Sequence, residues 1–179
     1  FNPNTWGYGV PDGKIHHYNA FRCHQEMIRR CKQEGVKSVL MLEDDAYVTE
    51  RFDEIHNWFS DENFTPDYFD LLYLGWWQGD HIDGMHAGNN LEIEKNWKEK
   101  KDFGIGTVTQ VGGLHGVIIN QSVFDLILSM PPVNPVDFQL NQFGHTRNNL
   151  NSFYIFPKLI GLKSSYSFTE KAFFQRDEI

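Results

Sequence analysis

Apolar side chains recur at helical spacing in the first part of the chain. Five residues share one face of an α-helix, at positions i, i+4, i+7, i+8 and i+11: Ala20, His24, Met27, Ile28 and Cys31. The pattern predicts a helix over residues 18–34 that ends at Gly35. Residues 1–17 are rich in Gly, Pro and Asn, and we expect them to form a loop.

Three apolar runs that do not alternate with polar residues follow, at residues 38–42, 70–76 and 117–120. Such runs are typical of strands that are buried on both faces of a parallel sheet. A fourth, aromatic run at 153–160 is β-like but is interrupted by Pro157.

The segments between these runs predict short helices and one long loop. We expect helices near residues 52–59 and 136–143, and a helix at 123–130 that is capped by Ser122. Residues 78–104 are polar and predict a long loop or lid. The alternation of strands and helices predicts one α/β domain over 1–179, with a mostly parallel central sheet flanked by helices.

Composition narrows the classes of partner. The net charge is −8 and no Lys/Arg cluster is long enough to follow a phosphate backbone, which excludes nucleic acid as a partner. No apolar run approaches the ~20 residues that span a bilayer, so we expect no membrane span. Cys23 and Cys31, about 12 Å apart along one helix, are expected to be reduced, which favours a cytoplasmic location. A lumenal location stays open if a signal or anchor precedes Phe1.

Three consecutive acids, Glu43, Asp44 and Asp45, follow the first apolar run. Open α/β sheets bind ligands at the carboxyl ends of their strands, and clustered carboxylates repel one another. A divalent cation that prefers oxygen ligands, Mg²⁺ or Mn²⁺, relieves that repulsion and bridges to substrate phosphates. In strand geometry Glu43 and Asp45 would project together, with Asp44 opposite. The alternative is that the acids begin a solvated loop or cap the next helix.

Several segments in a fixed order resemble glycosyltransferase family 25, which includes lipopolysaccharide-biosynthesis transferases and procollagen galactosyltransferases. They are His24 in a helix, VLMLEDDAYV (39–48), FDLLYLGWW (69–77), GGLHGVIINQSVFDLIL (112–128) and PVDFQL (135–140). The similarity covers about residues 13–165. It implies a GT-A type fold and inverting transfer from a nucleotide-sugar, with a UDP-sugar favoured and Mn²⁺ (or Mg²⁺) as the cofactor, to a hydroxyl of a glycan, lipopolysaccharide or protein.

The resemblance also implies roles for single residues. Asp45 would be the principal metal ligand, and Glu43 would be a second ligand or a hydrogen-bond partner of the donor's ribose or sugar. Asp44 and His24 would lie near the donor, although His24 also fits a core histidine bonded to a backbone carbonyl. Asp137, in the matching PVDFQL segment, would be the base that takes the acceptor's proton, with the alternative that it is a first-turn acid facing the helix dipole.

Five further residues carry hypotheses from their own chemistry. Gly112 and Gly113 allow close backbone approach to the donor. His115 could complete the metal shell or contact the sugar, or it is a turn histidine. Trp76 and Trp77 face opposite ways in a strand, so we expect one to be core and the other to stack on an acceptor sugar.

Two alternative functions remain open. The first is a non-catalytic sugar- or nucleotide-binding relative, which the loop-like segment 1–17 favours because the family has a nucleotide-cradling strand there. The second is a metal-dependent phosphohydrolase, suggested by GDHID at residues 79–83. The further Asp-x-His and Gly-Asn-His blocks that such enzymes need are absent, so this is the weakest of the three.

Overall fold

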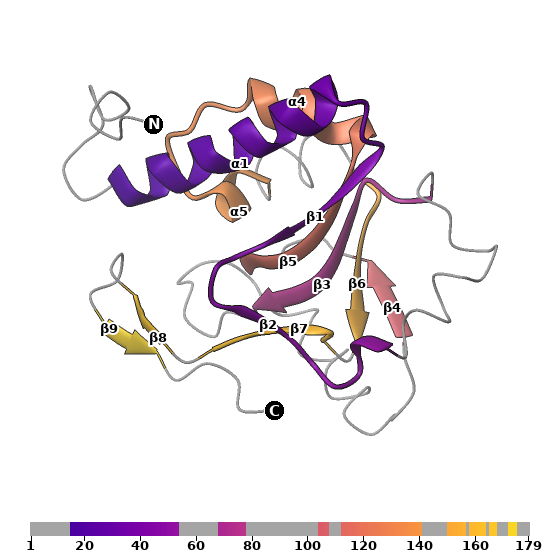
Figure 1. Cartoon of the computed structure of the whole chain (residues 1–179), viewed down its shortest axis with the longest axis vertical. Coiled ribbons are helices and arrows are strands. Elements are labelled where there is room, and N and C mark those ends of the chain that lie inside the picture. The colour runs from indigo at the N-terminus through magenta and orange to yellow at the C-terminus, as the bar shows by residue number, and fades with distance from the viewer. Residues whose placement is uncertain are drawn as a thin grey trace.

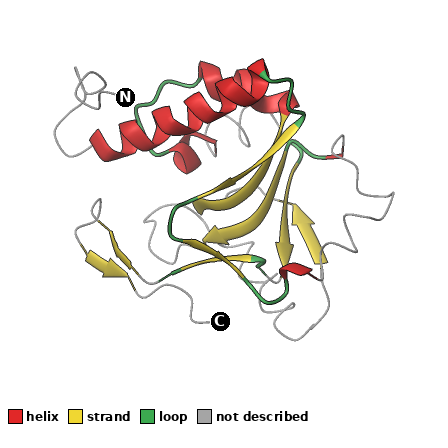
Figure 2. Ribbon diagram, viewed as in Figure 1, coloured by secondary structure: helices red, strands yellow, loops and turns green. Residues whose placement is uncertain are grey.

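The structure, a computed structural model, describes residues 15–53, 68–77, 104–107, 112–140, 150–156, 158–163, 165–167 and 172–174. These residues form a mixed α/β arrangement in which three helices lie over one face of a central sheet (Figures 1 and 2). The helices are α1 (Ile15–Gln33), α4 (Phe124–Ser129) and α5 (Val136–Gln139). None of the helices in this part of the chain is long and apolar enough to cross a bilayer.

The described strands form one five-stranded sheet and two short ribbons. The sheet has the order β1-β5-β3-β6-β4, and the ribbons are β2-β7 and β8-β9. The strand bounds are β1 (Ser38–Leu42), β2 (Ala46–Val48), β3 (Leu71–Trp77), β4 (Gly104–Thr107), β5 (Gly112–Asn120), β6 (Ser152–Phe156), β7 (Ile160–Leu162), β8 (Ser165–Ser167) and β9 (Ala172–Phe174).

The central sheet is mostly antiparallel, which corrects the expected parallel sheet. Only β3 and β6 pair in parallel, whereas β1–β5, β3–β5 and β4–β6 are antiparallel. It follows that β1, β3 and β6 share one direction, opposite to that of β5 and β4. The prediction failed because β5 is inserted between β1 and β3 in the opposite direction, a pairing that strand–helix alternation does not reveal.

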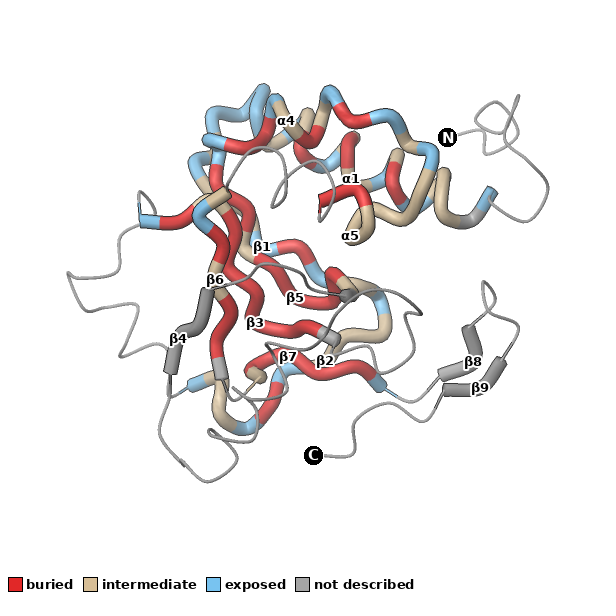
Figure 3. Tube along the Cα trace, turned by 180° about the vertical axis from the view of Figure 1, so that it is seen from behind, coloured by how far each residue is buried: buried red, intermediate tan, exposed pale blue. Residues whose placement is uncertain are grey.

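The bounds of strand β1 were predicted correctly, but the prediction that both of its faces are buried was wrong. It is an edge strand of the sheet, and its burial alternates (Figure 3). Met41 is buried under the helices, whereas Leu40 and Leu42 are 39% and 48% exposed. A continuous apolar run therefore did not mean two covered faces here.

Helix α1 starts three residues earlier than predicted and ends where expected. Gly35 has a φ of +70°, and two backbone bonds close the helix: Val36 N donates to Cys31 O (2.9 Å), and Gly35 N donates to Lys32 O (3.2 Å). This is the Schellman arrangement, in which glycine accepts the left-handed conformation without strain.

The buried face of α1 differs from the predicted one by about one position. Phe21, Gln25 and Ile28 are buried, whereas Ala20 and Met27 are exposed. Gln25 is in the core because its amide nitrogen donates to the last carbonyls of α4, Ile127 O at 3.0 Å and Met130 O at 2.9 Å. A buried carbonyl left without a donor costs about 1–3 kcal/mol, so a polar side chain is favoured at this point.

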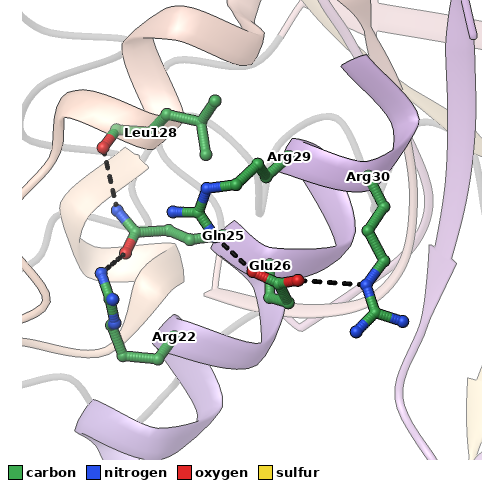
Figure 4. A network of polar contacts seen from close by, with 6 residues as sticks. All are labelled: Arg22, Gln25, Glu26, Arg29, Arg30 and Leu128. Carbon is green, nitrogen blue, oxygen red and sulfur yellow. Dashed lines mark hydrogen bonds and ion pairs between the residues drawn. The ribbon is translucent and has the colours of Figure 1, made fainter. Parts of the chain in front are cut away.

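Figure 4 shows Gln25 between Arg22 on α1 and Leu128 on α4. The Gln25 amide nitrogen also reaches Leu128 O at 3.3 Å, and its oxygen accepts from Arg22 at 3.0 Å. On the neighbouring turn Glu26 is paired with both Arg29 and Arg30. The helix is therefore fixed on α4 by a buried amide and is charged on its outer side.

The helix after β5 starts differently from the prediction. A 3-10 turn at Gln121–Val123 precedes α4, and the side chain of Asn120, rather than that of Ser122, supplies the cap by accepting from Ser122 N at 3.2 Å. Ser122 instead donates its hydroxyl to Asp70 at 2.5 Å, and Asp70 also accepts from Asn151 N at 2.9 Å. These bonds join the end of β5 to the starts of β3 and β6 at one end of the sheet.

The second face of the sheet is covered by β7 and its neighbours. Ile160 crosses two glycines on adjacent strands, Gly75 and Gly116, which are paired with each other. A Cβ at Gly116 would lie 2.7 Å from Ile160 Cβ, and one at Gly75 would lie 2.6 Å from Ile160 O. Ile160 can approach the sheet this closely because neither Gly75 nor Gly116 carries a side chain.

Candidate active site

Three of the predicted site segments meet at one edge of the central sheet. Strand β1 ends there before the acidic triplet, β3 ends there at Trp77, and β5 begins there at Gly112 (Figure 1). The register confirms the juxtaposition, because Leu42 pairs with Gly116 and Trp77 pairs with Gly112. Because β5 runs antiparallel to both β1 and β3, the start of β5 lies next to the ends of β1 and β3.

The acidic triplet lies on a tight turn between β1 and β2. Ala46 N donates to Glu43 O at 3.1 Å, and Lys163 N donates to Asp45 O at 2.9 Å. Glu43 and Asp45 are half-buried and Asp44 is exposed. Because β1 stops at Leu42, strand alternation does not apply to these residues, and the expected strand geometry of the acids is wrong.

The described residues contain no group of three or more His, Cys, Asp or Glu side chains arranged to hold a metal. His115 is 1% exposed and lies beside Gly75, where a Cβ would be 2.6 Å from its Cδ2. A metal shell that includes His115 therefore has no support from this geometry. The half-buried carboxylates of Glu43 and Asp45 do fit another kind of site, in which one or two carboxylates and the substrate's phosphates share the cation.

Asp137 connects helix α5 to the start of β5. One carboxylate oxygen accepts from Gly113 N at 3.0 Å, and the other accepts from Phe138 N at 2.8 Å. Gly113 has a φ of +74°, a conformation that favours glycine at this point. The two residues, which the sequence suggested separately, are therefore in direct contact, and Asp137 is held in a fixed position.

His24 and Tyr73 lie close enough to Asp137 for its charge to act on both. Nδ1 of His24 is 2.8 Å from Ala20 O. Burial lowers the pKa of His24, while the bond to Ala20 and the charge of Asp137 act in the opposite direction. Burial raises the pKa of the Tyr73 phenol, and Asp137 raises it further, so this phenol stays neutral.

The structure thus brings Gly113 and Asp137 into contact, and the charge of Asp137 reaches His24 and Tyr73. Tyr73 was not among the predicted site residues. It occupies a buried strand position between two leucines, and nothing in that pattern separates it from ordinary core aromatics.

Trp76 is the core member of the tryptophan pair and is not available to an acceptor sugar. It is 3% exposed, its Nε1 donates to Ile155 O at 3.2 Å, and its ring meets Tyr154 edge-on at 5.2 Å. The backbone of Trp77 pairs with Gly112, but its side chain lies outside the described part. Of the two tryptophans, only Trp77 is left for an acceptor role.

Two predicted segments also lie outside the described residues: the N-terminal stretch up to residue 14, and residues 78–103, which include GDHID. No protein-family model matches the chain, and no curated protein matches it either. The function is therefore argued from the geometry of the sheet edge and from the motifs that occupy it.

Proposed function

We propose that this chain is a metal-dependent inverting glycosyltransferase with a GT-A type fold, which moves a sugar from a nucleotide-sugar to a hydroxyl of a glycan, lipopolysaccharide or protein. One observation carries the proposal. The acidic turn, the glycine-rich start of β5 and Asp137 occupy the same edge of the sheet. Their order along the chain is also the order of the segments that resemble glycosyltransferase family 25.

The charge at this edge explains why a cation is part of the proposal. A diphosphate that approaches Glu43, Asp44 and Asp45 meets like charges, in a chain whose net charge is −8. Asp45 and Glu43 are the residues that would hold Mn²⁺ (or Mg²⁺), and Asp44, which is exposed, would face the donor. A divalent cation at such a site supplies neutralisation of the charge that develops on the leaving diphosphate.

The start of β5 allows the donor to approach closely, but only some of its backbone atoms are available for contacts with the donor. Gly112 and Gly113 carry no side chain to hinder a ligand. The N–H of Gly113 is already donated to Asp137. Donor contacts at Gly113 would therefore involve its Cα and carbonyl rather than its amide.

Inverting transfer breaks one bond and forms one bond. The acceptor oxygen bonds to the anomeric carbon while the bond from that carbon to the diphosphate oxygen breaks, and its electron pair leaves with the diphosphate. The acceptor's proton needs a base that is not shared with the cation. Asp137 is the carboxylate that we assign to this proton transfer, because it lies on α5, away from the acidic turn in sequence, and is fixed by two backbone donors.

The proposal is tested by thermal unfolding with a panel of UDP-, GDP-, dTDP- and CMP-sugars, with and without Mn²⁺. We expect one nucleotide-sugar to raise the melting temperature only when Mn²⁺ is present. A ligand at 100 times its Kd adds about 2.7 kcal/mol to the free energy of unfolding. Asp45→Asn should abolish this stabilisation, and Asp53→Asn, which removes an exposed acid just after β2, should keep it.

Other outcomes of this panel favour other functions. Equal stabilisation without metal, or an unchanged response in Asp45→Asn, contradicts the cation site. Stabilisation without transfer to any acceptor indicates a non-catalytic sugar- or nucleotide-binding relative. Release of inorganic phosphate indicates a phosphohydrolase.

A further inference from the structure

We propose that the open edge of β1, the side that faces away from β5, is an interface between two copies of this chain. The two β1 strands would pair antiparallel about a twofold axis at Leu40. Among the described strands β1 is bonded to β5 alone, yet it carries no charged residue and no proline (Figure 1). Proteins commonly place such residues on exposed edges to prevent pairing with other chains. The proposal goes beyond the proposed function and does not depend on it.

The backbone of β1 points alternately to β5 and to the open edge. In an antiparallel pair only every second residue exchanges hydrogen bonds with the neighbouring strand. Asn120 N donates to Asp70 O at 3.0 Å, on the side of β3, so Asn120 is turned away from β1. The next residue, Gln121, donates its N–H to Lys37 O at 2.7 Å, towards β1. Continued along the register of β1 and β5, this alternation directs the N–H and C=O groups of three residues to the open edge: Ser38, Leu40 and Leu42.

These outward groups allow the strand to pair with a second copy of itself. When two β1 strands run antiparallel with Leu40 opposite Leu40, Ser38 of each copy lies opposite Leu42 of the other. Every outward residue then meets an outward residue, and each such pair can exchange two backbone hydrogen bonds. If one strand slides by two residues, one outward residue of each copy loses its partner within β1. The register centred on Leu40 is therefore the one that uses the whole strand.

The side chains on the exposed face of β1 fit the same arrangement. Leu40 and Leu42 are 39% and 48% exposed, whereas Met41, between them, is buried under the helices. Residues directly opposite each other in an antiparallel pair have Cβ atoms about 4.5–5.5 Å apart. The two Leu40 side chains would therefore pack against each other across the axis, and this contact removes apolar surface from water.

Charge complementarity at the two ends of β1 favours an antiparallel second copy as the partner. In the register centred on Leu40, Lys37 of each copy lies opposite Glu43 of the other, one residue beyond each end of the strand. The Lys37 side chain is exposed and that of Glu43 is half-buried. Opposite charges across a strand pair stabilise it, and like charges destabilise it. A parallel copy in the same register would instead place Lys37 beside Lys37 and Glu43 beside Glu43.

Sedimentation velocity of the full chain over a range of concentrations tests the dimer. We expect the wild type to change from monomer to dimer as its concentration rises to about 1 mM. Leu40→Lys should stay monomeric, because two like charges would meet at the axis, and its circular dichroism spectrum should match that of the wild type, because Leu40 is partly exposed. The matched control Val133→Lys changes an apolar side chain that is 59% exposed outside β1, and it should dimerise as the wild type does.

A charge exchange tests the register without changing β1 itself. Lys37→Glu should raise the Kd of the dimer roughly tenfold, because two attractive contacts become repulsive. The double variant Lys37→Glu/Glu43→Lys restores opposite charges and should return the Kd to near the wild-type value. A Kd that Lys37→Glu leaves unchanged, or that the double variant does not restore, overturns the antiparallel register and with it the proposal.

Amide hydrogen exchange locates the interface residue by residue. The N–H groups of Leu40 and Leu42 should exchange more slowly as the wild type dimerises. Those of Val39 and Met41, which point to β5, should already be protected in the monomer. If exchange at Leu40 and Leu42 is the same in monomer and dimer, the copies meet elsewhere and the proposal is overturned.

The dimer and the proposed function fail in different experiments. A wild type that is monomeric at every concentration, or a dimer that persists in Leu40→Lys, overturns the self-pairing of β1 and leaves the transferase standing. Absence of binding by any nucleotide-sugar overturns the transferase, whereas the dimer is still decided by sedimentation and hydrogen exchange.

Discussion

Replacing Asp137 by Asn should lower turnover roughly 10²- to 10⁴-fold while leaving metal-dependent donor binding in place. The carboxylate supplies the negative charge for the proton transfer, and it does so from α5 rather than from the acidic turn that we assign to the cation. The measurement is kcat together with the thermal shift caused by the donor, in the same preparation.

Asp137→Asn also has a structural cost. An amide can accept from only one of the two backbone N–H groups that the carboxylate now serves, Gly113 and Phe138. We therefore expect a loss of stability of about 1 kcal/mol. Asp125→Asn is the matched control, because Asp125 is also a first-turn acid but is exposed and paired with Lys32. Normal turnover in Asp137→Asn contradicts the assignment of the proton-transfer step.

Replacing Gly116 by Ala should destabilise the fold by about 3 kcal/mol, at the upper end of what overpacking usually costs. The new Cβ would lie 2.7 Å from both Cβ and Cγ1 of Ile160, and the position of this Cβ is fixed by the backbone of β7, so side-chain rotation cannot relieve the clash. Strand β7 would have to move off the sheet. The free energy of unfolding from urea denaturation measures the effect.

The control for Gly116→Ala is Gly35→Ala, which separates steric crowding from backbone strain. Nothing lies within 4 Å of a Cβ at Gly35, but its φ is +70°. We expect a loss of about 1–2 kcal/mol there, from the left-handed conformation alone. If Gly116→Ala is no more destabilising than Gly35→Ala, the close packing of β7 on the sheet is not as described.

Local patterns in the sequence predicted the elements well and their surroundings less well. The helix before Gly35 and the strand at Ser38–Leu42 follow from periodicity and from an apolar run. The buried face of α1 was displaced because Gln25 is polar, yet it is buried to cap α4, a contact between residues about 100 positions apart. The prediction that both faces of β1 are buried was wrong, because β1 is an edge strand. Whether a strand lies at an edge depends on the strand order, which is a property of the whole chain.

For the candidate site, too, single residues could be predicted from local motifs, whereas the contacts between them could not. Glu43, Asp45, Gly113 and Asp137 were each suggested by a local motif, but the bond between Asp137 and Gly113 depends on how α5 folds back onto β5. The effect of Asp137 on the pKa of Tyr73 could not be predicted, because the two residues are far apart in the sequence. The burial of Trp76 depends on Tyr154 and Ile155, which lie on β6. The residues next to Trp76 in the sequence do not reveal that β6 packs there.

A crystal of the protein soaked with Mn²⁺ and the nucleotide-sugar that stabilises it shows whether the acidic turn holds the cation. We expect an anomalous manganese peak at the turn after β1, within bonding distance of Asp45 and of the donor's diphosphate. A turn without that peak, or with the side chains of Glu43 and Asp45 directed to bulk solvent while the donor is bound elsewhere, would contradict the proposed cation site.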